Sequence, residues 1–309
     1  MDRVSTAGFY TQALANLNDA QQRSLLASNQ VSSQKVAQDF KGYAGKAETL
    51  ASMNSVQARV TGLLNQNSVL QDRYTTQDSA LNQLSDAAGG ASQAITDALA
   101  SGSVDTLMQQ MSGYFSDATA ALNTKSQGRY LFAGGQVNTQ PVSATSMADL
   151  TTAPVASYFH NDQFVGQNQI DETSTIKGGM LASNLGSNLF NAFKDIQAFQ
   201  QSGGGPFTGQ LTDAQRTFLE GEVAKFNTAH TDAINATATN GSVLKRLTST
   251  ATDLTNRSDT MNGLIGNITD VNVADAISRL QNAQTSVQIS AQVFSTLKAS
   301  SLLSYLPVA

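Results

Sequence analysis

The strongest constraint on the fold is a heptad pattern that continues far beyond the length of an ordinary helix. Between residues 53 and 98, apolar or aromatic side chains recur at alternating spacings of three and four, and only Asn67 and Gln77 are exceptions. This repeat is typical of a coiled coil and predicts one helix roughly 70 Å long. Such a helix needs a long partner. The positions of this first seam are Met53, Val56, Val60, Leu63, Asn67, Leu70, Tyr74, Gln77, Leu81, Leu84, Ala88, Ala91, Ile95 and Ala98.

A second heptad seam, with more polar members, predicts that partner. A shorter apolar repeat from Val104 to Leu122 follows Ser101-Gly102-Ser103, which is typical of a turn between helices. Because short loops place neighbouring helices antiparallel, the three segments predict an antiparallel bundle. The positions of the second seam are Leu219, Val223, Phe226, His230, Ala233, Thr237, Asn240, Leu244, Leu247, Ala251, Leu254, Ser258, Met261, Ile265 and Ile268.

The middle of the chain lacks helical periodicity. Residues 128–135 place aromatic and aliphatic side chains between glycines, and residues 136–183 are rich in Ser, Thr and Gly with short strand-like pieces at 158–160 and 163–165. The predicted fold class is therefore mainly α, a long-helix coiled coil or bundle formed by the N- and C-terminal regions, with a small β-containing insert in the middle of the chain.

Five segments follow from these patterns. They are an N-terminal assembly helix and loop (1–48), a helical bundle with a terminal hairpin (49–135), a small β-containing outer insert (136–185), a helical return to the bundle (186–268) and a C-terminal assembly helix (269–309).

Both ends of the chain show helical spacing of apolar residues but carry very few charges. Asp19 and Arg23 are the only charged residues between positions 4 and 34, and Lys298 is the only one between positions 280 and 309. Burying an unpaired charge is costly, whereas a neighbour can satisfy an amide or a hydroxyl. We therefore expect other copies or other proteins to cover these ends. The alternative is that they are low-complexity tails that stay disordered.

The apolar members of the two ends are the candidate assembly residues. Each of them could instead belong to an intramolecular core. They are Val4, Tyr10, Leu14, Leu17, Val287, Phe294, Leu297, Leu302 and Leu303.

No catalytic, cofactor or metal site is predicted. The chain has no Cys, which excludes thiolate nucleophiles and Cys-ligated metals. His160 and His230 lie in different predicted units, and the Gly-Gly pairs match no phosphate-binding motif. The carboxylates are scattered and form no acid/base pair. We expect a protein that is not an enzyme and needs no cofactor.

Charge and hydropathy exclude further classes of partner. Only 13% of the residues are charged, and the formal net charge is -5, so we expect no nucleic-acid partner. No apolar run approaches the roughly 20 residues that span a bilayer, so membrane insertion is not expected. The first residues lack a basic segment followed by an apolar one, and we expect no cleaved signal peptide.

Four motifs together resemble the bacterial flagellin family. They are Arg3-Val4-Ser5-Thr6 with Tyr10, residues 31–36 (VSSQKV), residues 128–134 (GRYLFAG) and residues 294–306 (FSTLKASSLLSYL). The GRYLFAG stretch looks most like the hook-associated protein 3 branch of that family, the hook–filament junction proteins. One position departs from the family pattern, since Gln34 stands where a Gly is usual in the Ser-[Ser/Thr]-Gly-Lys core.

The resemblance implies an architecture and a role. The terminal helices would pair as an inner coiled coil, with the bundle outside them and the insert projecting outward. The protein would be a structural adaptor, joining the hook, through hook-associated protein 1, to the flagellin filament in a ring of its own copies. It would be exported without a cleaved signal by the flagellar type III apparatus, with a cytoplasmic chaperone, to an extracellular position. The alternatives are a filament-forming flagellin, a phage-tail or secretion-needle protein, and a soluble helical binding module or enzyme.

Overall fold

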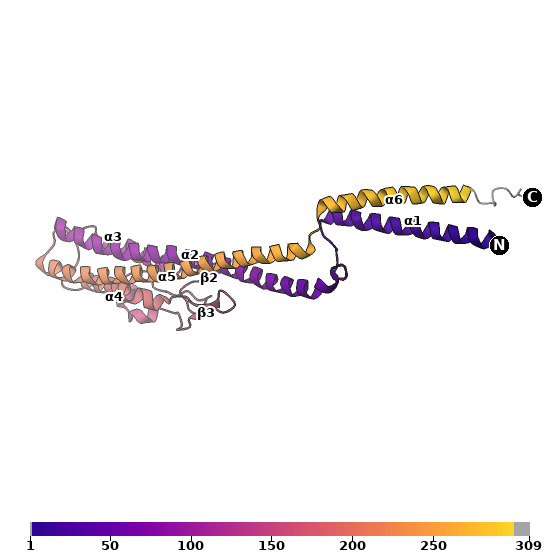
Figure 1. Ribbon diagram of the computed structural model, residues 1–309. Helices are drawn as coiled ribbons and strands as arrows, with labels where there is room; N and C mark the ends of the chain where they lie inside the picture. Colours follow the sequence, from indigo (N-terminus) through magenta and orange to yellow (C-terminus); the bar gives the residue numbers. More distant parts are fainter. Residues whose placement is uncertain (1, 300–309) are drawn as a thin grey trace, which may run out of the picture. The chain divides into compact units, whose positions relative to one another are not determined.

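The computed structural model describes residues 2–299, and it describes side chains from residue 8 to residue 297. The chain divides into two compact units, one made of the residues up to 60 and from 257 onward, the other of residues 61–256. The α-helices are α1 (Asp2–Ser33), α2 (Ala47–Ser101), α3 (Leu107–Leu122), α4 (Ala182–Gln201), α5 (Asp213–Thr269) and α6 (Val273–Ala299) (Figure 1).

Four short strands form two antiparallel hairpins, and the predicted mainly α fold with a small β-containing insert is confirmed. The strands are β1 (Lys125–Ser126), β2 (Arg129–Tyr130), β3 (Gly166–Gln169) and β4 (Thr175–Gly178). Three segments of 3-10 helix lie at Phe40–Lys46, Asp149–Thr151 and Val155–Tyr158.

The two heptad seams lie where the periodicity predicts them. The first seam is part of α2 and the second is part of α5, and every position of both is buried or half-buried. The predicted turn is also present, because α2 ends at Ser101 and Gly102 has a positive φ of 69°. Glycine adopts this left-handed conformation without steric cost, which lets the chain reverse direction there.

The core of residues 61–256 is shared by α2, α3, α4 and α5. Its largest fully buried side chains are phenylalanines. The ring of Phe115 in α3 lies 5.2 Å from that of Phe190 in α4, and the rings of Phe193 and Phe226 are 5.0 Å apart in a T-shaped arrangement. Large aromatic side chains at helical spacing thus join the return helix α4 to the bundle.

Two polar seam positions in this unit, Gln77 and Asn240, belong to one buried network. Gln77 Nε2 donates to Asn240 Oδ1 at 3.0 Å, and Asn240 Nδ2 donates to the carbonyl of Tyr74 and to Asp78 Oδ1. The amide groups pair α2 with α5 at one defined level, and a buried polar pair of this kind can fix helix register. Asn67 has a different role, because its Nδ2 donates to the carbonyl of Ile170 at 2.8 Å.

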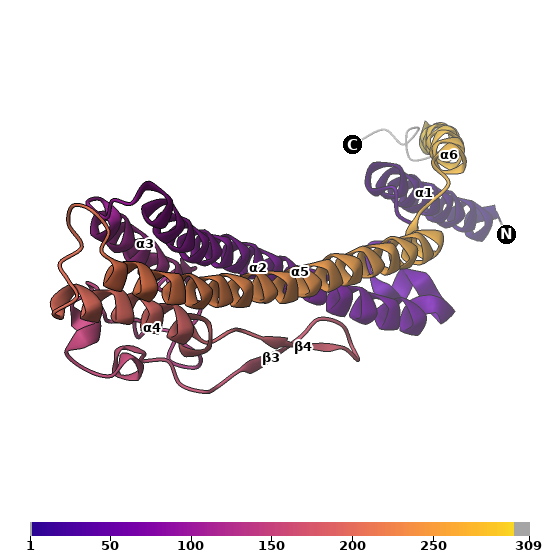
Figure 2. The same ribbon diagram turned by 90° about the vertical axis from the view of Figure 1, so that its left-hand side faces the viewer.

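The strands of the insert lie close to the strand-like pieces of the sequence but not on them. Residues 163–165 have no regular structure, so that local assignment is wrong. The piece at 158–160 is extended only in part, since Tyr158 ends a 3-10 segment but Phe159 forms an isolated antiparallel bridge with Val142. The β3–β4 hairpin follows instead (Figure 2). Its Ile170 and Ile176 are buried in one cluster with Leu70 and Tyr74 of α2. Tertiary packing of these two isoleucines outweighs local aromatic content.

Candidate assembly interface

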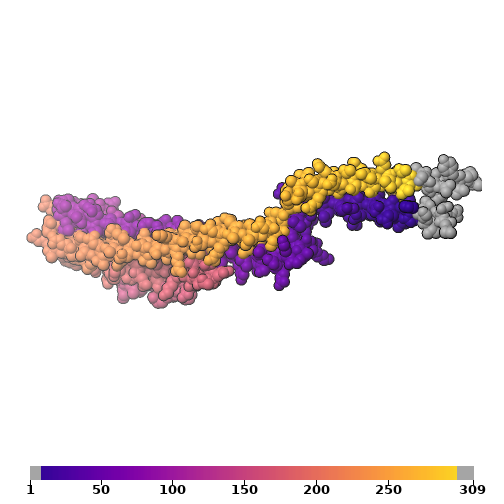
Figure 3. Space-filling model, in the orientation of Figure 1, coloured from indigo at the N-terminus to yellow at the C-terminus, as the bar shows by residue number. Residues whose placement is uncertain are grey.

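α1 and α6 pair as an antiparallel coiled coil. Tyr10 lies opposite Phe294 near one end, and Lys35 pairs with Asp270 just beyond the other. Cα atoms of the two helices lie within 8 Å of each other along the pair. In the space-filling view the indigo α1 and the yellow α6 are in continuous contact (Figure 3).

Small side chains explain this close approach. The buried residues facing α6 are mainly Ala13, Ala20 and Ala27, and the buried residues of α6 are Ala276 and Ala283. The half-buried members of the same heptads are Leu17, Ser24 and Val31 in α1 and Leu280, Val287, Ser290, Phe294 and Leu297 in α6. Since alanine carries only a Cβ atom, these positions let the two backbones pack closely.

The structure places the predicted assembly residues in three settings. Leu17, Val287, Phe294 and Leu297 are half-buried between α1 and α6. Tyr10 belongs to the same seam and packs on Phe294, although 42% of its surface stays exposed, whereas Leu14 is exposed beside the seam.

Three of the predicted residues cannot be placed by their side chains. Val4 lies in α1, but its side chain is outside the described side chains, and Leu302 and Leu303 lie outside the described residues.

The sequence pattern missed a second group of apolar residues, which are exposed away from the seam. Their signal is present in the sequence, since they fall between the heptad positions of helices that already have an apolar seam. Isolated exposed apolar residues are ordinary, but a concentration on one helix pair indicates a surface that a partner covers. The group contains Phe9, Leu25, Leu26, Ile277, Ile289 and Val293.

Charge divides the two flanks of the helix pair. With Leu17 and Leu280 at heptad position a and Ala20 and Ala283 at position d, the charged residues fall on positions c and g. They are Asp19, Arg23, Asp275 and Arg279, and Arg23 pairs with Asp19. Positions b and e carry no charged residue over residues 8–33 and 273–297. Because e positions face each other in an antiparallel pair, these residues form one surface, called here the ion-free face.

The ion-free face is exposed at each of its described positions. Its side chains are apolar, amide or hydroxyl groups, which a neighbouring protein can cover without desolvating an ion. The face consists of Thr11, Leu14, Asn18, Gln21, Leu25, Ser28 and Ser32 of α1 and Ala274, Ile277, Gln281, Gln284, Gln288, Ala291 and Ser295 of α6.

Hydrogen bonds tie the end of α1 to the start of α6. The amide of Val36 donates to the carbonyl of Thr269 at 2.8 Å, and the amide of Val271 donates to the carbonyl of Gln34 at 3.0 Å. Lys35 Nζ donates to Asp270 Oδ1 at 2.5 Å. This hydrogen bond from Lys35, with another from Thr269, lowers the pKa of the Asp270 carboxyl below its ordinary value.

Gln34 ends α1 in a left-handed conformation with φ of 57°. A residue in this conformation just after the last helical residue is a common helix stop, usually supplied by Gly. The position where the sequence departs from the family pattern is therefore the position where Gly would be least strained.

Neither a metal-binding cluster nor a membrane-spanning helix is present in the described part of the chain. Among residues 2–299 no group of three or more His, Asp or Glu side chains could hold a metal ion. No helix in the same range is both long enough and apolar enough to cross a bilayer.

Residues 223–306, which include most of α5 and all the described residues of α6, match the model of the bacterial flagellin C-terminal helical region. No curated protein matches the chain.

Three solved structures are similar to this chain over most of their own length. A candidate flagellar hook-associated protein from Vibrio parahaemolyticus is 11% identical with a TM-score of 0.60, and the match covers 72% of this chain and 97% of that one. FlgL of Bacillus cereus is 15% identical with a TM-score of 0.56, covering 70% and 99%. FlgL of Xanthomonas campestris is 12% identical with a TM-score of 0.57, covering 69% and 99%. At these identities the likeness shows the fold.

Proposed function

We propose that this protein is a structural component of the bacterial flagellum, an adaptor of the hook-associated protein 3 type that joins the hook to the flagellin filament. The observation that carries the proposal is the α1–α6 pair with its ion-free face. Support also comes from the match of residues 223–306 to the flagellin C-terminal region and from the fold shared with the two FlgL structures.

In this proposal the ion-free face is where neighbouring molecules pack. Copies of the chain form a ring, hook-associated protein 1 lies on the hook side and flagellin lies on the filament side. Of the predicted assembly residues, those of the seam hold α1 against α6, and Leu14 contacts a neighbouring molecule directly. The protein binds proteins and catalyses nothing. It reaches this extracellular position through the flagellar type III export apparatus, after release from a cytoplasmic chaperone.

Deletion of the gene tests the role directly. We expect electron microscopy of the deletion strain to show hooks without filaments, and we expect the wild-type gene to restore filaments. Normal filaments in the deletion strain would overturn the proposal.

A pair of adjacent substitutions tests the face. Gln281 lies on the ion-free face and Asn282 lies on the charged flank, and both side chains are exposed. Gln281→Lys would place an ammonium group under a neighbouring molecule, so we expect few filaments in a complemented strain. Asn282→Lys is the matched control and should support normal filaments. Equal behaviour of the two variants would contradict the assignment of the face.

A filament-forming flagellin is the second candidate, because the matched family model is that of flagellin itself. The two roles differ in self-assembly. Purified protein that polymerises alone into long filaments would favour the flagellin role, whereas protein that stays monomeric until hook and filament components are added would favour the adaptor.

A further inference from the structure

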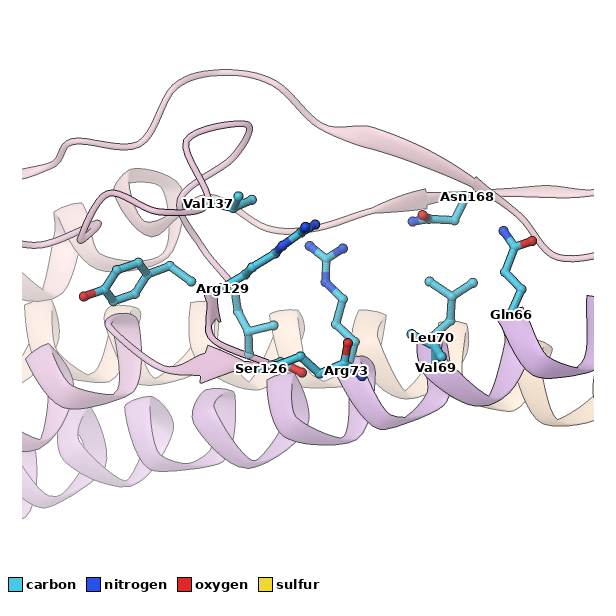
Figure 4. Close-up of a pocket in the computed structure, with 11 residues that line it drawn as sticks. Gln66, Val69, Leu70, Arg73, Ser126, Arg129, Val137 and Asn168 are labelled. Atoms are coloured by element: carbon cyan, nitrogen blue, oxygen red, sulfur yellow. The ribbon is translucent and has the colours of Figure 1, made fainter.

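A pocket of about 480 Å³ opens between α2, the β1–β2 hairpin and β3, within residues 61–256 (Figure 4). Arg73 of α2 and Arg129 of β2 extend into it from two elements, with their guanidinium groups pointing toward each other. The other lining residues are uncharged and include Gln127 and Tyr130.

The pocket holds cationic groups without an anion of its own. None of its lining residues is acidic, and neither arginine has an ion pair or side-chain hydrogen bond to any described residue. Lys125 adds a third cation nearby, with Nζ 4.4 Å from the centroid of the Tyr130 ring. Like charges that converge in a concave site repel each other and attract an anion, and guanidinium groups bind carboxylates in a bidentate geometry.

The backbone of the β1–β2 hairpin fixes the position of Arg129. Ser126 pairs with Arg129 across a two-residue turn, and both turn residues, Gln127 and Gly128, have positive φ angles of 51° and 79°. This geometry matches the tight hairpin turn that suits twisted strands. The arginine is therefore presented by a short rigid element and not by a long loop.

The same unit also presents an exposed carboxylate on a rigid turn. Residues 170–174 connect β3 to β4, and the exposed Glu172 lies in the middle of this turn beside Asp171. The side chain of Ile170 is fully buried, and its carbonyl accepts the hydrogen bond from Asn67. Gln169 Nε2 donates to the carbonyl of Glu172 at 3.2 Å, which further restrains the turn.

We propose that the Arg73–Arg129 pocket binds the Glu172 carboxylate of a second copy of this chain. The inference rests on the proposed function insofar as that function places identical copies side by side. Charge complementarity favours the second copy, since a chain with few charged residues concentrates two cations in one pocket and two adjacent carboxylates on one turn. Because pocket and turn are different patches, the contact is head-to-tail and generates a ring or a helix of copies.

Charge reversal tests the pairing in flagella assembled from the full chain. Arg129→Glu and Glu172→Lys each place like charges in contact, and we expect each to reduce the fraction of filament-bearing cells about tenfold or more. The double variant Arg129→Glu/Glu172→Lys restores opposite charges between copies and should recover filaments. Lys177→Glu is the control, because Lys177 is exposed in β4 and does not line the pocket. It should have little effect.

Cross-linking supplies a second, independent readout, since the chain has no native Cys. Gln127→Cys at the pocket and Thr173→Cys beside Glu172 leave the proposed charges intact. We expect flagella from cells that express both single variants to give disulfide-linked dimers after mild oxidation, and flagella from either variant alone to give none. Thr173→Cys combined with Asn191→Cys, an exposed site on α4, should also give none.

The outcomes separate this inference from the proposed function. If the double charge variant fails to recover filaments and the mixed cysteine variants do not cross-link, the pocket does not bind a second copy, although the adaptor role can stand. A partner in the form of another acidic protein would give loss with Arg129→Glu alone and no effect of Glu172→Lys, which overturns the inference. The inference would also be overturned if the purified protein bound inorganic phosphate, Arg129→Glu abolished that binding, and filament assembly stayed normal in both Arg129→Glu and Glu172→Lys.

Discussion

Tyr10 of α1 and Phe294 of α6 meet with ring centroids 4.8 Å apart and ring planes inclined by 45°. They are almost three hundred residues apart in the chain, and both were predicted as assembly residues. Their contact is intramolecular, which gives the aromatic pair the role of closing the helix pair near one end.

Removing either ring should loosen that end. Tyr10→Ala and Phe294→Ala should each speed amide exchange in the neighbouring turns of α1 and α6, and a double-mutant cycle should give a coupling free energy of about 0.5–1.5 kcal/mol. Phe9→Ala is the control, because Phe9 is 65% exposed and should show little coupling to Phe294. Additive effects of Tyr10→Ala and Phe294→Ala would mean that the rings do not stabilise each other.

Gln34 offers a test of backbone strain. Its left-handed conformation costs a side-chain-bearing residue roughly 1–2 kcal/mol. Gly would remove this strain, but its greater freedom in the unfolded chain offsets part of the gain. We expect Gln34→Gly to raise the local free energy of opening at the end of α1 by about 0.5–1 kcal/mol, measured by hydrogen exchange.

The matched control for this prediction is Gln22→Gly. Gln22 is exposed in the interior of α1, where Gly should destabilise by about 0.5–1 kcal/mol. A change of the same sign in both variants would rule out the strain explanation.

The buried amide network predicts a large effect in residues 61–256. Asn240→Ala removes the acceptor of Gln77 and two further hydrogen bonds, so it should reduce the free energy of opening of α2 and α5 by about 1–3 kcal/mol. Asn235 lies on the exposed side of α5 and serves as the control. Asn235→Ala should change the free energy of opening by no more than about 0.5 kcal/mol. The double variant Gln77→Leu/Asn240→Leu leaves no unpaired amide. If it lowers the free energy of opening more than Asn240→Ala does, an unpaired amide is not the cause of the destabilisation.

Acid should weaken the link between α1 and α6 through Asp270. The Asp270 carboxyl has a pKa below its ordinary value of 3.8 because Lys35 and Thr269 donate hydrogen bonds to it. Its folded pKa is depressed, so its contribution to stability is present above the unfolded pKa and is lost as the pH falls through the folded pKa. We expect the amides of Val36 and Val271 to open more readily below about pH 3.8, after correction for the intrinsic pH dependence of exchange.

Asp270→Asn provides the control for the acid effect. The variant should open more readily at neutral pH and should lack the acid step. An unchanged step in Asp270→Asn would show that another group titrates there.

Most of the fold was predicted from the heptad spacing of apolar residues. The seams of α2 and α5 could be read from the sequence because each buried position repeats within one helix, so only local spacing was needed. The strands at 166–169 and 175–178 could not be read in this way. Their place depends on Ile170 and Ile176 packing against Leu70, about a hundred residues earlier in the chain.

The candidate sites show the same division. The scarcity of charge at both ends was visible in the sequence, but the ion-free face emerged only when the partner helix of α1 was known. Arg129 lies in the GRYLFAG motif, but its convergence with Arg73 gave no signal, because no local pattern relates an α2 side chain to one in β2. Nor could the sequence tell that Tyr10 faces Phe294 and not a neighbouring molecule.

The alanines between α1 and α6 have an energetic consequence. An alanine loses no rotamer entropy on burial, so the pairing of α1 with α6 requires little ordering of side chains at these positions. The same methyl groups remove only a small apolar area from water, and the gain per residue is correspondingly slight. A helix pair built this way forms readily but is only weakly stable by itself. Its rigidity must come from the molecules that surround it.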